Sequence, residues 1–244
     1  MIQLTGSFSN GTTNPSPAIT LVPPANGTAN GIGLIIFSGG AYAVTADHEG
    51  GNYADFFSKK GFTCFVTHYR VAPNQHPAMF EDALAAIKTV RKKSEEFDLD
   101  KIGVIGSSAG GHLVSLLLTR YPESSGSVSL RPDFGILCYP VISGISHTHD
   151  DSFKNLLGDH DSSDLRRTVS TELLVHERTP PCFMWHTQED ALVPFENSLL
   201  FASALRKKNI PFELHIYEKG SHGLGLNTPF QWAEECCRWV NELQ

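Results

Sequence analysis

The segment Gly106-Ser107-Ser108-Ala109-Gly110 fits the pattern G-x-S-x-G, in which a serine sits on a strained turn between a strand and a helix. The flanks suit both elements, because residues 101–105 are mainly apolar and residues 112–119 are apolar and helix-compatible. Such a turn lifts the Ser108 hydroxyl toward a base and leaves unpaired N–H groups at the start of the helix. The pattern therefore predicts a nucleophilic serine. The alternative is an ordinary strand-to-helix turn whose serine caps the helix.

A nucleophilic serine on this turn needs a base and an acid later in the chain, in the order Ser, then Asp or Glu, then His. His222 is the candidate base, because it lies in a glycine-flanked loop between the last predicted strand and the C-terminal helix. Asp190 is the candidate acid, because it follows the predicted strand 182–187 and would orient the imidazole. Its neighbour Glu189 is the rival. A loop histidine and a solvated turn without catalytic roles are the alternatives.

The other histidines near predicted elements are poorly placed to act as the base. His68, His186 and His215 lie inside predicted strands, and His112 lies one turn into the helix that follows Ser108. We therefore expect none of these four to take the proton from the serine.

Stabilisation of a developing oxyanion requires backbone N–H groups close to the serine. The first strong predicted strand ends in Ser38-Gly39-Gly40-Ala41-Tyr42, where glycine lets the backbone approach a substrate closely. We predict that the amides of Gly40, Ala41 and Ala109 form this oxyanion hole. A glycine-rich turn without a ligand is the alternative interpretation.

Apolar runs of strand length alternate with segments of helical spacing along the chain. The predicted strands are 33–37, 62–68, 101–105, 134–139, 182–187 and 212–217, with a short edge strand at 19–22. The predicted helices are 53–60, 79–96, 111–120, 196–208 and 230–243. This alternation predicts an α/β fold whose central sheet is mostly parallel and carries helices on both faces.

Residues 141–179 interrupt the alternation and are largely polar. An insertion between two core strands at this point would lie over the carboxyl edge of the sheet, so we predict a small cap or partial lid. Closely spaced His and Asp residues invite a metal site, since both are metal ligands. Their spacing matches no ligand pattern, and we predict neither a metal nor an organic cofactor.

Length, charge and cysteine content exclude several classes of protein. The 244 residues, 41% hydrophobic, suffice for one sizeable core, and we expect a single domain over residues 1–244. A net charge of −7 without a long basic cluster argues against nucleic acid as a partner. The apolar runs are well short of the ~20 residues of a membrane span, and no secretory leader is visible. Five cysteines without zinc-like or C-x-x-C spacing predict reduced thiols and a cytoplasmic location.

The order of these motifs resembles the α/β-hydrolase fold over nearly the whole chain, from Gly39-Gly40 through Ser108 and Asp190 to His222. The segment Tyr69-Arg70-Val71-Ala72-Pro73 resembles the Y-R-L-A-P segment of hormone-sensitive-lipase-like esterases. Residues 213–217, together with 220–226, are similar to bacterial acetyl esterases related to acetylxylan esterases. Lipases and esterases carry an HGGG-type loop where this chain has residues 38–41, with Ser in place of His and Ala in place of the last Gly.

Together the motifs and the resemblance predict a serine carboxylesterase that hydrolyses short-chain acyl esters, with acetylated sugars as the expected substrates. Because a triad of this kind does not distinguish esters from amides, an arylformamidase or a small peptidase stays an alternative. A non-catalytic ligand-binding protein of this fold is the alternative from another class. The predicted partner is a small-molecule ester, and the sequence leaves a homo-oligomer open.

Overall fold

The computed structural model describes residues 2–3, 17–25, 27–122, 124–125 and 128–243. Its main strands are β1 (Ile2–Gln3), β2 (Ala18–Val22), β3 (Ile32–Phe37), β4 (Thr63–His68), β5 (Lys101–Ser107), β8 (Phe134–Cys138), β9 (Cys182–Thr187) and β10 (Phe212–Tyr217). The two-residue strands β6 (Ser124–Ser125) and β7 (Val128–Ser129) pair with each other in a separate sheet.

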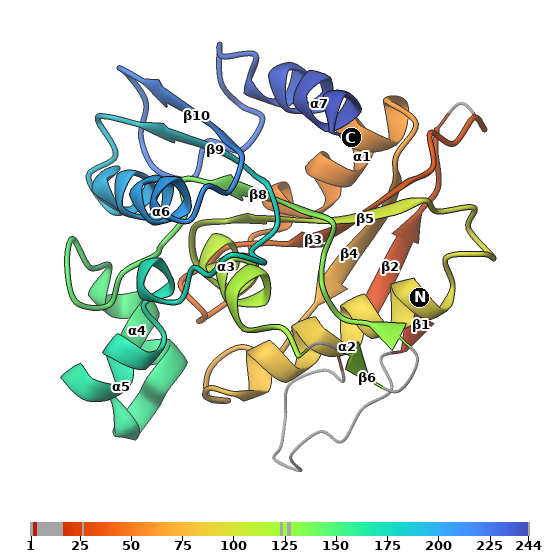
Figure 1. Ribbon diagram of the computed structural model, residues 1–244. Helices are drawn as coiled ribbons and strands as arrows, with labels where there is room; N and C mark the ends of the chain where they lie inside the picture. Colours follow the sequence, from red (N-terminus) through yellow and green to blue (C-terminus); the bar gives the residue numbers. More distant parts are fainter. Residues whose placement is uncertain (1, 4–16, 26, 123, 126–127, 244) are drawn as a thin grey trace.

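The main strands form one eight-stranded sheet in the order β1-β2-β4-β3-β5-β8-β9-β10 (Figure 1). β2 runs antiparallel to both of its neighbours, and the other neighbouring pairs of this sheet are parallel. The predicted mostly parallel sheet is therefore confirmed. The prediction of an edge strand at 19–22 is wrong, because β1 pairs with the outer side of β2.

Helices cover both faces of the sheet (Figure 1). The helices are α1 (Gly51–Lys59), α2 (Ala78–Lys92), α3 (Ser108–Arg120), α4 (Asp150–Leu157), α5 (Ser163–Thr168), α6 (Glu196–Lys207) and α7 (Trp232–Glu242), with short 3₁₀ turns η1 (Asp47–Glu49), η2 (Gly158–His160) and η3 (Thr171–Leu173). α1 and α7 pack on one face, and α2, α3 and α6 pack on the other.

Side chains of β3 alternate between the two cores, as the period of a strand requires. Ile35 and Phe37 join the cluster under α2 and α3, whereas Leu34 and Ile36 join the cluster under α1 and α7. Because both faces are covered, every residue of this strand is buried and the strand is apolar throughout.

Helix α2 ends at Lys92, earlier than the predicted end at residue 96. The Ser94 hydroxyl donates to the carbonyl of Arg91, 2.9 Å away, and occupies an acceptor that a further helical turn would use. Because the Ser94 side chain competes with the backbone for this carbonyl, the helix ends and the charged residues that follow are not helical.

The 141–179 insertion contains α4, α5, η2 and η3, between β8 and β9. Helix α4 turns Phe153, Leu156 and Leu157 into the core beneath it and leaves its charged side to solvent. A largely polar sequence therefore still docks, because these few apolar residues recur at helical spacing.

Candidate active site

Ser108 lies at the turn from β5 into α3, where its backbone adopts a φ of +53°. A non-glycine residue in the left-handed region is strained, and such strain is typical of functional turns. A Cβ on Gly106 would lie 2.2 Å from the carbonyl oxygen of Gly110, and a Cβ on Gly110 would lie 2.2 Å from that of Phe37. Only glycine fits at both positions, so the pentapeptide is required by the geometry of this turn.

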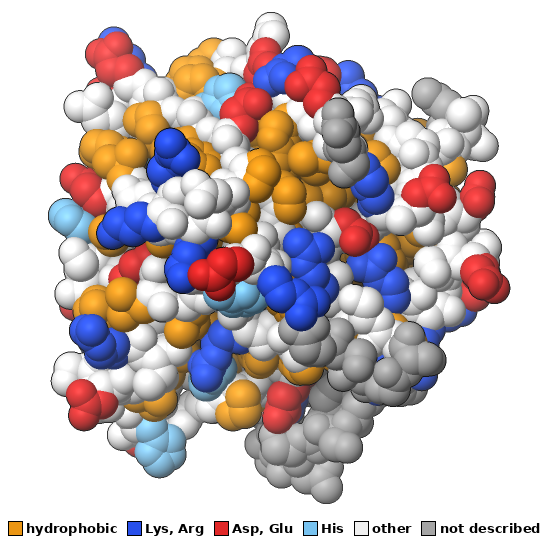
Figure 2. Space-filling model, viewed as in Figure 1, with side chains coloured by type: hydrophobic (Ala, Val, Ile, Leu, Met, Phe, Trp, Pro, Cys, Tyr) orange, Lys and Arg blue, Asp and Glu red, His pale blue; other side chains and the backbone are white. Residues whose placement is uncertain are grey.

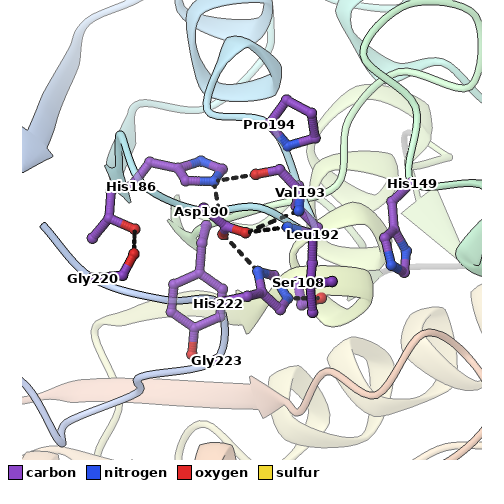
Figure 3. Close-up of polar contacts among 12 residues, drawn as sticks. Ser108, His149, His186, Asp190, Leu192, Val193, Pro194, Gly220, His222 and Gly223 are labelled. Carbon is purple, nitrogen blue, oxygen red and sulfur yellow. Dashed lines mark hydrogen bonds and ion pairs between the residues drawn. The ribbon is translucent and has the colours of Figure 1, made fainter. Parts of the chain in front are cut away.

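Ser108, His222 and Asp190 form one chain of hydrogen bonds (Figure 3). The Ser108 Oγ lies 2.8 Å from His222 Nε2, and His222 Nδ1 lies 2.6 Å from Asp190 Oδ2. The three residues follow β5, β10 and β9, whose carboxyl ends meet at one edge of the sheet. Nδ1 faces a carboxylate and therefore donates, which leaves Nε2 free to accept the serine proton. The structure thus brings all three predicted residues together.

Asp190 is held as a buried carboxylate by donors on every side. Its Oδ1 accepts from the amides of Leu192 and Val193, at 3.0 and 2.9 Å. Burial raises the pKa of Asp190, but hydrogen bonds from His186, His222 and the Val193 amide outweigh that cost and hold the pKa well below its usual range. The group stays ionised at neutral pH and fixes the His222 tautomer.

His186 is a second histidine on this carboxylate, a contact that the sequence did not reveal. Its Nε2 lies 2.9 Å from the Val193 carbonyl and 3.3 Å from Asp190 Oδ2. Both neighbours are acceptors, so Nε2 carries the proton, and Nδ1 accepts from the Ser198 hydroxyl at 2.9 Å. The expectation that His186 is not the base agrees with this geometry, since both of its nitrogens are occupied.

Glu189, the rival of Asp190, points elsewhere. Its Oε2 accepts from the Gly220 amide at 3.2 Å in an exposed contact. It supports the loop that carries His222 but makes no hydrogen bond to that imidazole.

The loop after β3 presents the predicted oxyanion donors. Gly40 and Ala41 have φ values of +125° and +54°, and neither amide donates to any residue that the structure describes. The Ala109 amide belongs to the first turn of α3, where N–H groups have no intrahelical acceptor. Gly40 and Ala41 line the same cavity as Ser108, and Ala109 directly follows Ser108 in the chain, so these backbone groups belong to the surroundings of the hydroxyl.

The same loop is anchored by His112, which is fully buried in α3. Its Nδ1 lies 2.8 Å from the Tyr42 hydroxyl, and its Nε2 lies 2.8 Å from the Val169 carbonyl in the insertion. Burial lowers the pKa of His112 to about 4, so the ring is neutral. This histidine therefore ties the oxyanion loop to the insertion.

Glu49 is a buried carboxylate beneath the oxyanion loop that the sequence did not reveal. Its Oε2 accepts from the Gly39 amide at 2.7 Å, and its Oε1 accepts from the Tyr139 hydroxyl at 2.6 Å. That hydroxyl in turn accepts from the Gly225 amide at 3.0 Å, in the loop of His222. Glu49 and Tyr139 therefore join the two loops that flank Ser108.

Ser108 and His222 open into a cavity of about 390 Å³. Gly40 and Ala41 line one part of it, and His149 and Asp151, from the insertion, line another. Two residues of the His- and Asp-rich run in the insertion therefore line the cavity.

The described residues include neither a metal-binding cluster nor a membrane-spanning helix. No group of three or more His, Cys, Asp or Glu side chains in that part of the chain is arranged to hold a metal ion. Similarly, no helix among those residues is long and apolar enough to cross a membrane.

Comparison with models of known protein families shows to which family the chain belongs. The model of the prolyl oligopeptidase family matches residues 53–244. The chain belongs to the prolyl oligopeptidase family. Its fold is the α/β-hydrolase fold that the sequence motifs predicted.

The chain is also similar to parts of two longer proteins whose names refer to xylan. Endo-1,4-beta-xylanase B of Butyrivibrio fibrisolvens is 36% identical over 203 residues, which is 78% of this chain and 32% of the relative. An acetylxylan esterase of Xylanibacter ruminicola is 32% identical over 214 residues, which is 84% of this chain and 44% of the relative. The chain spans less than half the length of both.

One solved structure matches along almost its full length. It is an acetyl ester-xyloside bifunctional hydrolase from Caldicellulosiruptor lactoaceticus, which has a TM-score of 0.93 and 39% identity, and the match covers 99% of this chain and 95% of that one. The predicted resemblance to acetylxylan-esterase-related proteins is therefore confirmed.

Proposed function

We propose that the protein is a serine carboxylesterase that removes short acyl groups, acetyl above all, from sugars. The observation that carries this proposal is the hydrogen-bonded series Ser108–His222–Asp190, which opens into the cavity at the sheet edge. The names of the relatives, an acetylxylan esterase and an acetyl ester-xyloside hydrolase, support acetyl esters of sugars as the substrate class.

In the proposed reaction, Ser108 Oγ attacks the ester carbonyl while His222 Nε2 takes its proton. Asp190 keeps Nδ1 as the protonated nitrogen and stabilises the imidazolium that forms. The amides of Gly40, Ala41 and Ala109 donate to the oxyanion of the tetrahedral intermediate. His222 then protonates the departing alcohol oxygen. Water repeats the sequence on the acyl-enzyme and releases the acid.

Two measurements test the proposal. A fluorophosphonate probe should label one serine per chain, and Ser108→Ala should abolish the labelling. A panel of 4-nitrophenyl acetate, acetylated xylo-oligosaccharides and acetyl anilides should show turnover of the esters well above that of the anilides. Preference for the anilides would support an amide hydrolase, and absence of both labelling and turnover would support a ligand-binding protein.

We also propose a reducing compartment, the cytoplasm, as the site of action. All five cysteines are buried free thiols, which supports this location. Small acetylated oligosaccharides, rather than polymeric xylan, would then be the available substrates.

A further inference from the structure

His149 presents an unused ring nitrogen to the cavity beside Ser108. Its Nδ1 lies 2.9 Å from the Ser152 hydroxyl, and its carbonyl accepts from the Ser152 amide at 3.1 Å. These two contacts fix the ring at the start of α4. Its Nε2 has no hydrogen-bond partner among the described residues, and the side chain lines the cavity together with Ser108 and His222. In the view of Figure 3, Ser108 lies between the rings of His222 and His149.

The chemistry of this nitrogen suits a hydroxyl group. Partial burial and the neighbouring His222 lower the pKa of His149, although Asp151, Asp190 and Asp150 raise it, so the ring is neutral at pH 7. Nε2 donates if the Ser152 hydroxyl donates to Nδ1, and it accepts if that hydroxyl accepts. A hydroxyl matches both tautomers because it both donates and accepts, whereas a carboxylate or an ammonium group matches only one.

Asp151 adds a second polar group to the same wall of the cavity. Its side chain is 75% exposed, and its ion pair is a long one, 3.7 Å to Lys154. A carboxylate held this loosely accepts from a second hydroxyl of a ligand. It also repels acidic groups, so the wall favours a neutral alcohol with several hydroxyls.

We propose that His149 and Asp151 form a subsite that binds free hydroxyls of the alcohol portion, next to the ester bond being cleaved. The inference rests on the proposed esterase function and extends it, because it assigns the recognition of a neutral polyhydroxylated alcohol to two named residues. These residues bind the substrate in the ground state and transition state alike, without taking part in proton transfer.

Matched substrates isolate the contact. Ethylene glycol monoacetate and ethyl acetate differ by one hydroxyl, and methyl 2-O-acetyl-β-xyloside adds the sugar ring. We expect His149→Ala to lower kcat/KM about five- to tenfold for the two hydroxylated acetates, as for the loss of one neutral hydrogen bond. Ethyl acetate and 4-nitrophenyl acetate should change less than about twofold, since they lack the hydroxyl. His149→Gln should restore most of the loss, because an amide both donates and accepts.

His160→Ala is the control, because His160 lies in the same insertion, is exposed and does not line the cavity. The thermal midpoint of each variant, compared with that of the native protein, reports that the variant is folded. An equal loss on all four esters would overturn the subsite and make His149 a support of the reacting groups. Equal kcat/KM of the native protein for ethyl acetate and glycol monoacetate, unchanged in His149→Ala, would also overturn it. Failure of the proposed function looks different: the native protein would cleave none of the esters, and the subsite would fall with it.

Discussion

The turns at the carboxyl edge of the sheet and the 141–179 insertion line the same cavity, but they hold their polar groups in different ways. Asp190 is fully buried and His222 is 13% exposed at its side chain, and both are saturated with hydrogen bonds. Asp151 is exposed, and one nitrogen of His149 is unpaired among the described residues. The first arrangement is preorganised for chemistry, and the second leaves bonding capacity for a ligand.

The outer surface of the molecule shows a third pattern. Figure 2 shows charged and apolar side chains interspersed over one face of the molecule, with no large region of a single charge. Charges of both signs that are interspersed in this way set up no strong long-range field of one sign on this face.

Replacement of the nucleophile should have the largest effect and tests the sheet-edge half of the comparison. Ser108→Ala should lower kcat for 4-nitrophenyl acetate by about a thousandfold or more, because nucleophile and base act as a unit. The thermal midpoint should stay close to that of the native protein. A folded variant that keeps more than about a tenth of the activity would remove Ser108 from the mechanism.

Replacement of Asp190 should cause the second-largest loss of activity. Asp190→Asn should lower kcat about a hundred- to ten-thousandfold, because the amide no longer fixes the Nδ1–H tautomer of His222. Glu189→Gln is the matched control: it lies one residue away, and its contact to Gly220 is exposed, so kcat should change little. The opposite ranking of the two variants would show that the acid is Glu189.

Much of this site could be predicted from the sequence, because its residues follow strands in a parallel sheet. The strand-turn-helix pattern identifies Ser108, and the glycine-flanked loop after the last strand identifies His222. Sequence alone did not separate Asp190 from Glu189, since both follow β9. The distinction depends on which side chain meets the Leu192 and Val193 amides, which is a property of the folded turn.

Glu49 could not be predicted, for a physical reason. It is one acid in a polar loop, and it is buried only because Tyr139, 90 residues later, and the Gly39 amide both donate to it. The helices of the insertion were not predicted either, for a similar reason. Its polar residues dominate the composition, while α4 docks through Phe153, Leu156 and Leu157.

His112 connects the loop after β3 to the 141–179 insertion, and acidic pH should weaken this connection. The pKa of His112 is 6.5 in an unfolded chain and about 4 in the buried site. Between these values the unfolded chain binds the additional proton, so stability falls as the pH drops from about 6.5 to about 4. The stabilisation lost over this window is about 3 kcal/mol, because one pKa unit corresponds to about 1.36 kcal/mol.

Urea unfolding at several pH values measures that loss. His112→Gln should reduce the slope of the unfolding free energy between pH 6.5 and 4 without abolishing it, since burial also lowers the pKa of His76 and of His149. An unchanged slope in a folded His112→Gln protein would show that this histidine does not titrate with folding.

The smallest expected effect concerns acyl length, and it tests whether the cavity ends where the insertion places polar groups. An octanoyl chain has six methylene groups more than acetyl, and these would contribute about 5 kcal/mol if they all left water. Among the described residues that line the cavity, Leu192 is the only large apolar side chain, so most of those methylenes find no apolar side chain to cover them and stay hydrated. Leu192, the largest apolar side chain of the cavity, is itself 59% exposed and covers little of a long chain. In a series of 4-nitrophenyl esters from acetyl to decanoyl, kcat/KM for the acetyl ester should therefore be well above kcat/KM for the octanoyl ester. A profile that rises steadily to decanoyl would mean that the insertion opens an apolar groove, and it would leave the assignment of Ser108 untouched.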